Sequence, residues 1–229
     1  MLIEQILAHY NREEKDREWA NPLRGSNAGK CQRAMAYQLH GFPALPLRAR
    51  ARLVFRLGDL IEKDLTEIAV LYGLTRMQEE VSVEIAGQRI TGHIDGVINE
   101  TVVDFKSCTT YRVKEARRGQ VAYNEQMQFY MKATGLQTAL VVYYVKEDSE
   151  LYEQLIHFDP QVWEQIEARF TRVMQSTPEN LPDREYGPDE KGRLRYPCSY
   201  CNWVNLCHEG YDLSFDGKGK PQLICHANS

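Results

Sequence analysis

The sequence predicts a mixed α/β fold built around a small central sheet that helices flank. A long stretch at about 48–72 carries apolar residues at helical spacing. Three short runs between 80 and 108 then alternate apolar and polar residues, which is typical of strands. A helical stretch, two more strands and a last helix follow. A chain of 229 residues is long enough for one sizeable domain with a full core.

The first third of the chain is predicted to be helical. Residues 1–20 have an amphipathic pattern and are followed by the turn-rich segment NPLRGSN. A second helix is expected at about 28–39. The third, at about 48–72, is expected to end at Gly73, because glycine commonly follows the last turn of a helix.

The strands are predicted from the runs EVSVEI, RITGHIDGVI and TVVDFKS, with a hairpin turn at Asn99-Glu100. A helix is expected at about 113–133. The runs TALVVYYVK and ELYEQLIHF are then expected to pair as two strands. A last helix is expected from Asp159-Pro160 to about 175, since aspartate is a preferred N-cap and proline suits the first helical position.

Composition limits the classes of function. Hydrophobic residues make up 43% of the chain and charged residues 26%, as in a soluble globular protein. No apolar run approaches the ~20 residues of a membrane span, and the start lacks the order of a signal peptide, so a cytoplasmic location is expected. The net charge of −4 gives no general attraction to nucleic acid, so DNA would have to bind a local basic patch.

Two basic stretches could form such a patch. Each could also be an ordinary solvated helix face. The predicted DNA-binding residues come from the first stretch, LRARARLVFR. The two sets are Arg48, Arg50, Arg52 and Arg56, and Arg112, Lys114, Arg117 and Arg118.

The run VVDFKS places a carboxylate and an ammonium group side by side. In a strand, Asp104 and Lys106 point to one face, while Val103 and Phe105 point to the other. Asp95, in GHIDG, is expected on the neighbouring strand, close to Asp104. Two close carboxylates repel each other unless a cation lies between them, and hard oxygen ligands suit Mg²⁺ or Mn²⁺.

This set of residues is suited to phosphodiester hydrolysis. That reaction needs a metal ion to polarise the phosphoryl group and a cation near the developing charge. Lys106 can supply the cation, and Glu62 can add a third carboxylate from the preceding helix. Gln126 and Tyr130 are four residues apart and therefore share a helix face, although Tyr130 could simply belong to the core. A solvated Asp–Lys pair on a surface hairpin is the alternative interpretation.

These residues resemble the motifs of the RecB-type branch of the PD-(D/E)XK nucleases. Two differences are mild: Asp104 stands where glutamate is common, and Glu62 stands where many members have histidine. The resemblance implies a restriction-endonuclease-like core, contact between the Phe105 carbonyl and the metal ion, and support of the site and of a DNA phosphate by Gln126 and Tyr130. The matching motifs, in the family's order, are GxxxE (Gly58–Glu62), GHID ending at Asp95, DFK (Asp104–Lys106) and QxxxY (Gln126–Tyr130).

Clustered cysteines form a second candidate site. Cys198, Cys201 and Cys207 have the spacing C-x2-C-x5-C, and Cys31 is the candidate for a fourth ligand. In a cytoplasmic chain, such cysteines are expected to bind a metal rather than to form disulfides. A zinc site with four cysteines, or with His208 replacing one of them, is the alternative. The two remaining cysteines, Cys108 and Cys225, are interpreted as an ordinary buried thiol and a tail residue.

One cysteine before the core and three after it resemble the iron–sulfur nucleases of the same superfamily, which are the CRISPR-associated RecB-like exonucleases and the AddB-type nuclease domains. The resemblance implies a [4Fe–4S] cluster that joins the N- and C-terminal segments. It also implies a single domain over 1–229. Within it, about 45–176 form the nuclease core, 26–44 and 177–210 bind the cluster, and 211–229, which include GKGK, form a poorly ordered tail.

The expected function is a metal-dependent deoxyribonuclease. It would hydrolyse single-stranded DNA or DNA ends in CRISPR adaptation, repair or phage DNA metabolism. Exonuclease activity is expected, with endonuclease activity as an additional option. The alternative is a catalytically silent nucleic-acid-binding or scaffold protein of the same fold, held together by zinc or an iron–sulfur cluster. The presence of Asp95, Asp104 and Lys106 together favours an active enzyme. The expected partners are DNA, other proteins of a DNA-processing complex, and further copies of the chain.

Overall fold

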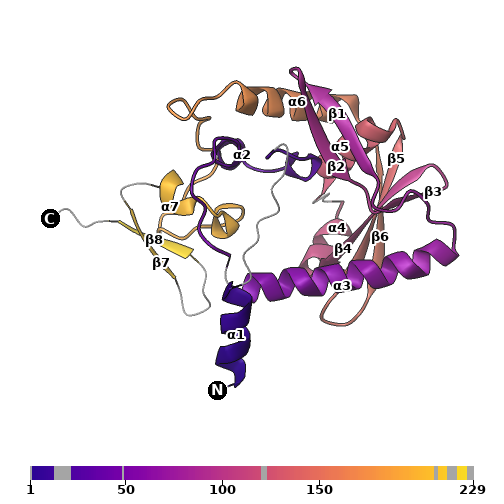
Figure 1. Cartoon of the computed structure of the whole chain (residues 1–229), viewed down its shortest axis with the longest axis horizontal. Coiled ribbons are helices and arrows are strands. Elements are labelled where there is room, and N and C mark those ends of the chain that lie inside the picture. Colours follow the sequence, from indigo (N-terminus) through magenta and orange to yellow (C-terminus); the bar gives the residue numbers. More distant parts are fainter. Residues whose placement is uncertain are drawn as a thin grey trace. The chain divides into compact units, whose positions relative to one another are not determined.

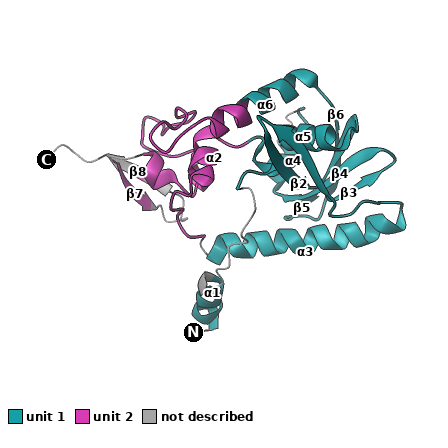
Figure 2. Cartoon of the chain, turned by 45° about the horizontal axis from the view of Figure 1, so that its top comes forward, with its two compact units in different colours: residues 1–29, 48–168 teal, residues 30–47, 169–229 magenta. Residues whose placement is uncertain are grey.

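The chain divides into two compact units in a computed structural model (Figures 1 and 2). Unit 1 comprises Met1–Gly29 and Arg48–Ala168, and unit 2 comprises Lys30–Leu47 and Arg169–Ser229. None of the described helices is long and apolar enough to cross a membrane. The structure describes residues 2–12, 22–47, 49–119, 123–208, 211–215 and 221–225.

Unit 1 contains a four-stranded mixed sheet, which confirms the predicted fold class. Its strand order is β3-β4-β5-β6. Strands β4 and β5 are parallel and the other pairs are antiparallel, so a helical crossover must join β4 to β5. A separate antiparallel hairpin consists of β1 and β2. The strands are β1 (Glu80–Ile85), β2 (Gln88–His93), β3 (Gly96–Ile98), β4 (Thr101–Cys108), β5 (Thr138–Val145) and β6 (Leu151–His157).

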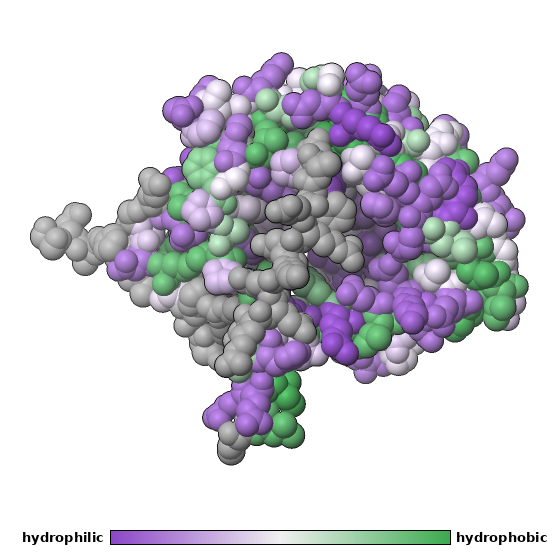
Figure 3. All heavy atoms as spheres, in the orientation of Figure 1, coloured by the Kyte–Doolittle hydropathy of each residue, from purple (hydrophilic) through white to green (hydrophobic). Residues whose placement is uncertain are grey.

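A long helix, α3 (Ala49–Leu71), covers one face of this sheet. Leu65 and Ala69 of α3 pack against a small core that includes Val103 and Phe105 of β4. The remaining apolar residues of α3 are largely exposed, up to 80% for Leu71. Figure 3 shows such apolar surface near the C-terminal end of α3, at the lower right. Only a narrow strip of α3 is therefore used for packing.

The opposite face of the sheet carries α5 (Asn124–Thr134), followed later in the chain by α6 (Pro160–Met174). The α5 helix buries a run of side chains that includes Met127 and Phe129. The N-terminus of α6 is capped as predicted, because Asp159 Oδ1 accepts a hydrogen bond of 2.8 Å from the Gln161 amide. The side chains of β4 alternate between these two covering layers.

Two elements differ from the sequence predictions. The predicted helix at 113–133 is two helices, α4 (Thr110–Ala116) and α5, because Gly119 ends the first with φ +81°. The predicted strand RITGHIDGVI is interrupted between β2 and β3, where the Ile94 amide donates to the Glu79 carbonyl. The helix α1 covers Leu2–Arg12, and the rest of the predicted first helix lies outside the described residues. The turn at Asn99-Glu100 is confirmed, with φ +47° and +59°.

Unit 2 is smaller and contains the segments predicted to bind the cluster. Leu194, Val204 and Leu223 form its core, against which Cys198 and Cys201 pack. Residues 211–215 and 221–225, which the sequence analysis assigned to a tail, pair as the antiparallel strands β7 and β8. Leu223 of β8 is buried, and this burial stabilises the hairpin. The elements are α2 (Gln32–Leu39), η2 (Cys198–Tyr200), α7 (Val204–Cys207), β7 (Tyr211–Phe215) and β8 (Pro221–Cys225).

Gly25 opens the short 3-10 helix η1 (Gly25–Asn27) of unit 1 and provides a test of its packing. A Cβ at this position would lie 2.4 Å from Cδ1 of the fully buried Phe129 ring. Gly25→Ala is therefore expected to destabilise the fold by about 1–3 kcal/mol, as overpacking of a core does. Thermal unfolding would measure this as a drop of about 2–4 °C for each kcal/mol. Gly187→Ala is the matched control, since a Cβ there meets nothing within 4 Å; equal melts for the two variants would contradict the predicted packing.

Candidate active site

Asp104 and Lys106 lie on the face of β4 that is turned toward α5. Asp104 is only 1% exposed, and its Oδ2 forms an ion pair with Lys106 Nζ. Burial would lower the pKa of Lys106, but the nearby carboxylates of Asp104 and Asp95 outweigh it and raise that pKa. Lys106 is therefore held in its charged form beside the buried carboxylate.

Asp95 lies in the bend between β2 and β3 rather than on a strand. Its Oδ2 accepts a hydrogen bond of 2.7 Å from the Phe105 amide, so it is fixed directly beside β4. Burial, together with the charge of Asp104, raises the pKa of Asp95 to about 8. The predicted proximity of Asp95 and Asp104 therefore arises from the interruption between β2 and β3, which the sequence pattern did not reveal.

Glu62 reaches the same region from α3. A Cβ at Gly58, one turn earlier, would lie 3.4 Å from Ser107 Oγ, so the helix passes close to β4 here. Burial raises the pKa of Glu62, and the charges of Lys106 and Asp104 also act on it. The Gln78 side chain donates to Glu62 Oε1 over 3.1 Å. Sequence reasoning missed Gln78, which belongs to no recognisable motif.

Gln126 and Tyr130 approach from α5. The amide Nε2 of Gln126 lies 3.4 Å from Asp104 Oδ1 and 3.1 Å from the Tyr130 hydroxyl. Gly92 of β2 makes room for Tyr130, because a Cβ there would lie 2.8 Å from the ring. The glycine of GHID therefore has a steric role that the motif alone did not reveal. Burial raises the pKa of Tyr130, so its hydroxyl remains protonated.

Tyr123, immediately before α5, is a further neighbour that the sequence did not indicate. Lys106 Nζ lies 5.6 Å from the centre of its ring, at a distance typical of cation–π contacts. The Tyr123 ring in turn lies 6.2 Å from that of Tyr143 on β5. The Lys106 ammonium therefore contacts the Tyr123 ring as well as the Asp104 carboxylate.

Comparison with protein-family models identifies the superfamily of this chain. The family model described as the PD-(D/E)XK nuclease superfamily matches residues 2–208. The chain belongs to this superfamily. No curated protein sequence matches the chain.

Several solved structures are similar to this chain at low sequence identity, and two of them have TM-scores of 0.50 or more. The structure of SSO0001 is 17% identical, with a TM-score of 0.54 over 90% of this chain and 96% of that one. A phage-related exonuclease from Haemophilus somnus 129PT is 15% identical, with a TM-score of 0.50 over 68% and 92%. An alkaline exonuclease, LHK-Exo, solved in complex with dAMP, is 17% identical, with a TM-score of 0.49 over 75% and 90%.

The acidic residues of this superfamily member suit a divalent cation. Asp95 is buried, and its pKa is raised partly by the nearby charge of Asp104. The Asp104 Oδ2 atom is also buried and has no hydrogen bond of normal geometry with any described residue. A divalent ion would relieve the repulsion between these carboxylates. In the described part of the chain, no three aspartate, glutamate, histidine or cysteine side chains are arranged as a complete metal site. Lys106 instead compensates the charge of Asp104.

The predicted DNA-binding arginines lie near the start of α3. Arg50 and Arg56 are exposed, and the Arg56 guanidinium lies 6.0 Å from the centre of the Tyr10 ring. Arg52 is half-buried, and Arg48 lies outside the described residues. At about 1.5 Å per residue, Arg56 is about 9 Å along the helix from Glu62. The described arginines therefore lie on the N-terminal side of Glu62 along α3. Their contact with DNA stays a prediction.

The four predicted cysteine ligands all lie in unit 2, although no three of these cysteines are arranged as a complete metal site among the residues that the structure describes. Burial, and then the charges of Cys201, Cys207 and Cys31, raise the pKa of Cys198 to about 11. Burial also raises the pKa of Cys201, on which Cys207 and Cys31 act as well. The four thiols therefore interact electrostatically although 167 positions separate the first two in the sequence.

A network around Glu185 holds the segment that contains Cys31. Glu185 accepts hydrogen bonds of 2.9 Å from both the backbone amide and the side chain of Gln32. Arg169 forms an ion pair of 3.0 Å with Glu185 and donates to the Lys30 carbonyl over 2.6 Å. Both neighbours of Cys31 are therefore anchored to residues of α6 and of the loop that follows it.

The other candidate ligands are placed differently. His208 is 2% exposed, and its Nε2 has no hydrogen-bond partner among the described residues. Cys108 is buried in unit 1 at the end of β4, as predicted for an ordinary thiol. The side chain of Cys225 lies outside the described part of the chain.

Proposed function

We propose that this superfamily member is a metal-dependent deoxyribonuclease that hydrolyses single-stranded DNA or DNA ends. The observation that carries the proposal is the buried pair of Asp95 and Asp104 with the charged Lys106 beside it. Known exonucleases such as the one from Haemophilus somnus share the fold, which supports the same class of activity. The role in CRISPR adaptation, repair or phage DNA metabolism is part of this proposal and follows from the sequence resemblance.

The proposed metal ligands are Glu62, Asp95, Asp104 and the Phe105 carbonyl. PD-(D/E)XK nucleases typically use Mg²⁺ or Mn²⁺. Such an ion, when bound, supplies Lewis-acid activation of the phosphoryl group and of the attacking water.

The residues of the chain have distinct parts in this mechanism. The Phe105 amide fixes the Asp95 carboxylate, and Gln126 contacts Asp104, so both acids are held before substrate arrives. Lys106 keeps its proton and places a positive charge next to the reacting phosphate. A fixed positive charge is worth most where negative charge develops in the transition state.

We also propose that Cys31, Cys198, Cys201 and Cys207 hold a [4Fe–4S] cluster. Their mutual electrostatic interaction and the anchoring of Cys31 by the Glu185 network support a common ligand. Thiolates are the usual ligands of such clusters. Zinc is the alternative metal. The buried His208 Nε2 has no hydrogen-bond partner among the described residues, which supports this alternative because histidine can replace one cysteine in a zinc site.

Removal of divalent ions is expected to abolish cleavage. Protein dialysed against a chelator should leave a labelled single-stranded oligonucleotide intact, and added Mg²⁺ or Mn²⁺ should restore cleavage, because the paired carboxylates need a cation. A melt before and after dialysis shows whether the fold survived. Circular single-stranded DNA, run in parallel, separates cutting from ends from internal cutting. Full activity in excess chelator would mean that the proposed metal mechanism is wrong.

A further inference from the structure

The α4 helix and the turn that follows it carry a local excess of positive charge. Residues 110–119 contain four basic residues and one acidic residue, in a chain whose net charge is −4. Arg112 forms an ion pair of 2.9 Å with Glu115, and Arg117 forms one with Glu150. Lys114 and Arg118 are exposed, and neither forms an ion pair with any residue that the structure describes. These two cations are therefore available to an outside partner.

Lys114 and Arg118 lie on the same side of the helix as an aromatic residue. Tyr111, Lys114 and Arg118 follow one another at intervals of three and four, which places them on one side of a helix. Arg117 keeps helical backbone angles, and the Arg118 amide donates to the Glu115 carbonyl, so the helical turn continues past the end of α4. The opposite side of α4 is buried through Val113 and Ala116.

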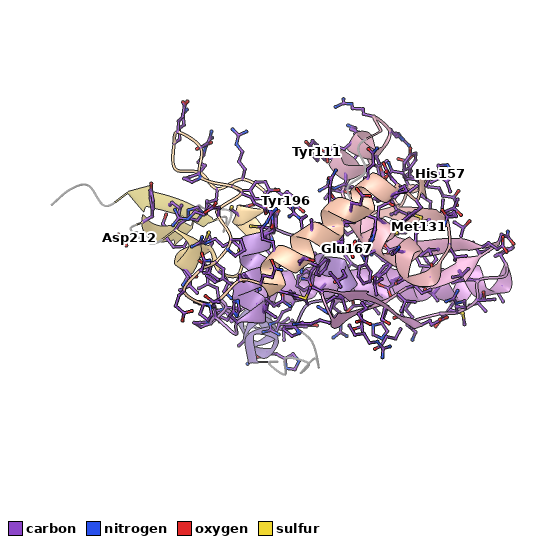
Figure 4. All side chains as sticks on the ribbon, turned by 90° about the horizontal axis from the view of Figure 1, so that it is seen from above. Tyr111, Met131, His157, Glu167, Tyr196 and Asp212 are labelled. Atoms are coloured by element: carbon purple, nitrogen blue, oxygen red, sulfur yellow. The ribbon has the colours of Figure 1, made fainter. Side chains whose placement is uncertain are left out.

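Tyr111 exposes its ring rather than packing it. Tyr111 is 69% exposed; its hydroxyl interacts with the Glu115 carboxylate, and its ring packs against no other ring among the described residues. Figure 4 shows it at the outer edge of unit 1. Surfaces that bind single-stranded nucleic acid combine exposed aromatic rings with cations. The bases stack on the rings, and the cations contact the phosphates.

The position of α4 connects this face to the candidate active site. Strand β4 carries Asp104 and Lys106, and α4 begins two residues after that strand ends. Arg112 of α4 acts electrostatically on Tyr123, and the ring of Tyr123 lies beside Lys106. The α4 helix therefore directly follows the strand that carries the candidate catalytic residues, and its Arg112 lies close enough to Tyr123 to act on it.

We propose that the α4 face, formed by Tyr111, Lys114 and Arg118, binds the single-stranded DNA next to the bond that is cut. Tyr111 stacks on a base, and Lys114 and Arg118 contact phosphates. The proposal rests on the proposed nuclease function and adds to it a surface that selects single strands. It assigns a role to the second basic stretch of the sequence, which could otherwise be an ordinary solvated helix face.

The salt dependence of binding tests the two cations. The affinity for a fluorescent single-stranded oligonucleotide is measured in chelator at several salt concentrations, for the whole chain and for the Lys114→Gln/Arg118→Gln variant. The slope of log affinity against log salt is expected to fall in magnitude by about 1.4, which corresponds to two lost phosphate contacts on a single strand. Arg89→Gln/Arg195→Gln is the control, because it removes the same charge from exposed arginines elsewhere. An unchanged slope, or an equal change in the control, overturns the proposal.

A matched pair of variants tests stacking. Tyr111→Ala is expected to weaken binding of the oligonucleotide by about tenfold or more, whereas Tyr111→Phe keeps the ring and the affinity. Blunt duplex DNA should bind equally to all three proteins. Equal affinity of Tyr111→Ala and wild type, or tighter binding of RNA of the same sequence, overturns the assignment to single-stranded DNA.

The same samples separate this proposal from the nuclease proposal. The wild type could cleave DNA with Mn²⁺ while the salt dependence of binding is the same in the α4 variant. That result would refute the proposal for the α4 face and support the nuclease proposal. Alternatively, the salt dependence of binding could change in the α4 variant while the wild type cleaves no DNA in Mg²⁺ or Mn²⁺. That result would refute the nuclease proposal and support the α4 face as a binding surface.

Discussion

Lys106→Ala is expected to lower the rate of DNA cleavage by at least about 100-fold, the size of effect seen when one charge-stabilising group is removed from a transition state. Binding of DNA should remain close to that of the wild type, because phosphate contacts elsewhere supply most of the affinity. Single-turnover cleavage at saturating DNA measures the first quantity, and anisotropy in chelator measures the second.

Two further variants make the result interpretable. Lys106 compensates the buried Asp104, so its removal could also weaken the fold. Lys106→Gln keeps the length of the side chain and a donor while removing the charge, and it should lose activity to a similar extent. Lys132→Ala removes a lysine from α5 whose ammonium contacts Trp163, and it should keep full activity. A wild-type rate in Lys106→Ala would mean that the active site lies elsewhere.

Cys31→Ala is expected to remove the iron, and with it the brown colour that an iron–sulfur protein has. The other three proposed ligands lie close together in the sequence, whereas Cys31 precedes Cys198 by about 167 residues, so its ligation would close a very long loop. Metal binding is coupled to folding in such sites. The melting temperature of Cys31→Ala should therefore fall, and cleavage should fall indirectly with the stability of the protein.

Elemental analysis for iron and zinc, beside a thermal melt, measures this outcome on anaerobically purified protein. Cys108→Ala is the matched control, since it removes a buried thiol from unit 1 and should keep the full metal content. A wild type that holds one zinc ion and no iron would refute the cluster and support the zinc alternative, in which His208 becomes a ligand. Full metal content and an unchanged melt in Cys31→Ala would refute the long-range closure for either metal.

Local patterns in the sequence determined most of the helices and strands. The helical spacing at 48–72 predicted α3, and the alternation in VVDFKS correctly assigned Val103 and Phe105 to the face opposite Asp104. These predictions succeed because a helix repeats every 3.6 residues and a strand every two, so each pattern depends only on neighbours in the chain. The sequence motifs also indicated the acidic residues, Lys106 and the four cysteines.

The tertiary structure alone decided what depends on contacts between distant segments. The sequence did not show that Gly119 would separate α4 from α5, or that residues 211–215 would pair with residues 221–225. It gave no sign of Gln78 and Tyr123 as neighbours of Glu62 and Lys106. Such contacts follow from the packing of whole elements, and packing joins residues that no local periodicity relates.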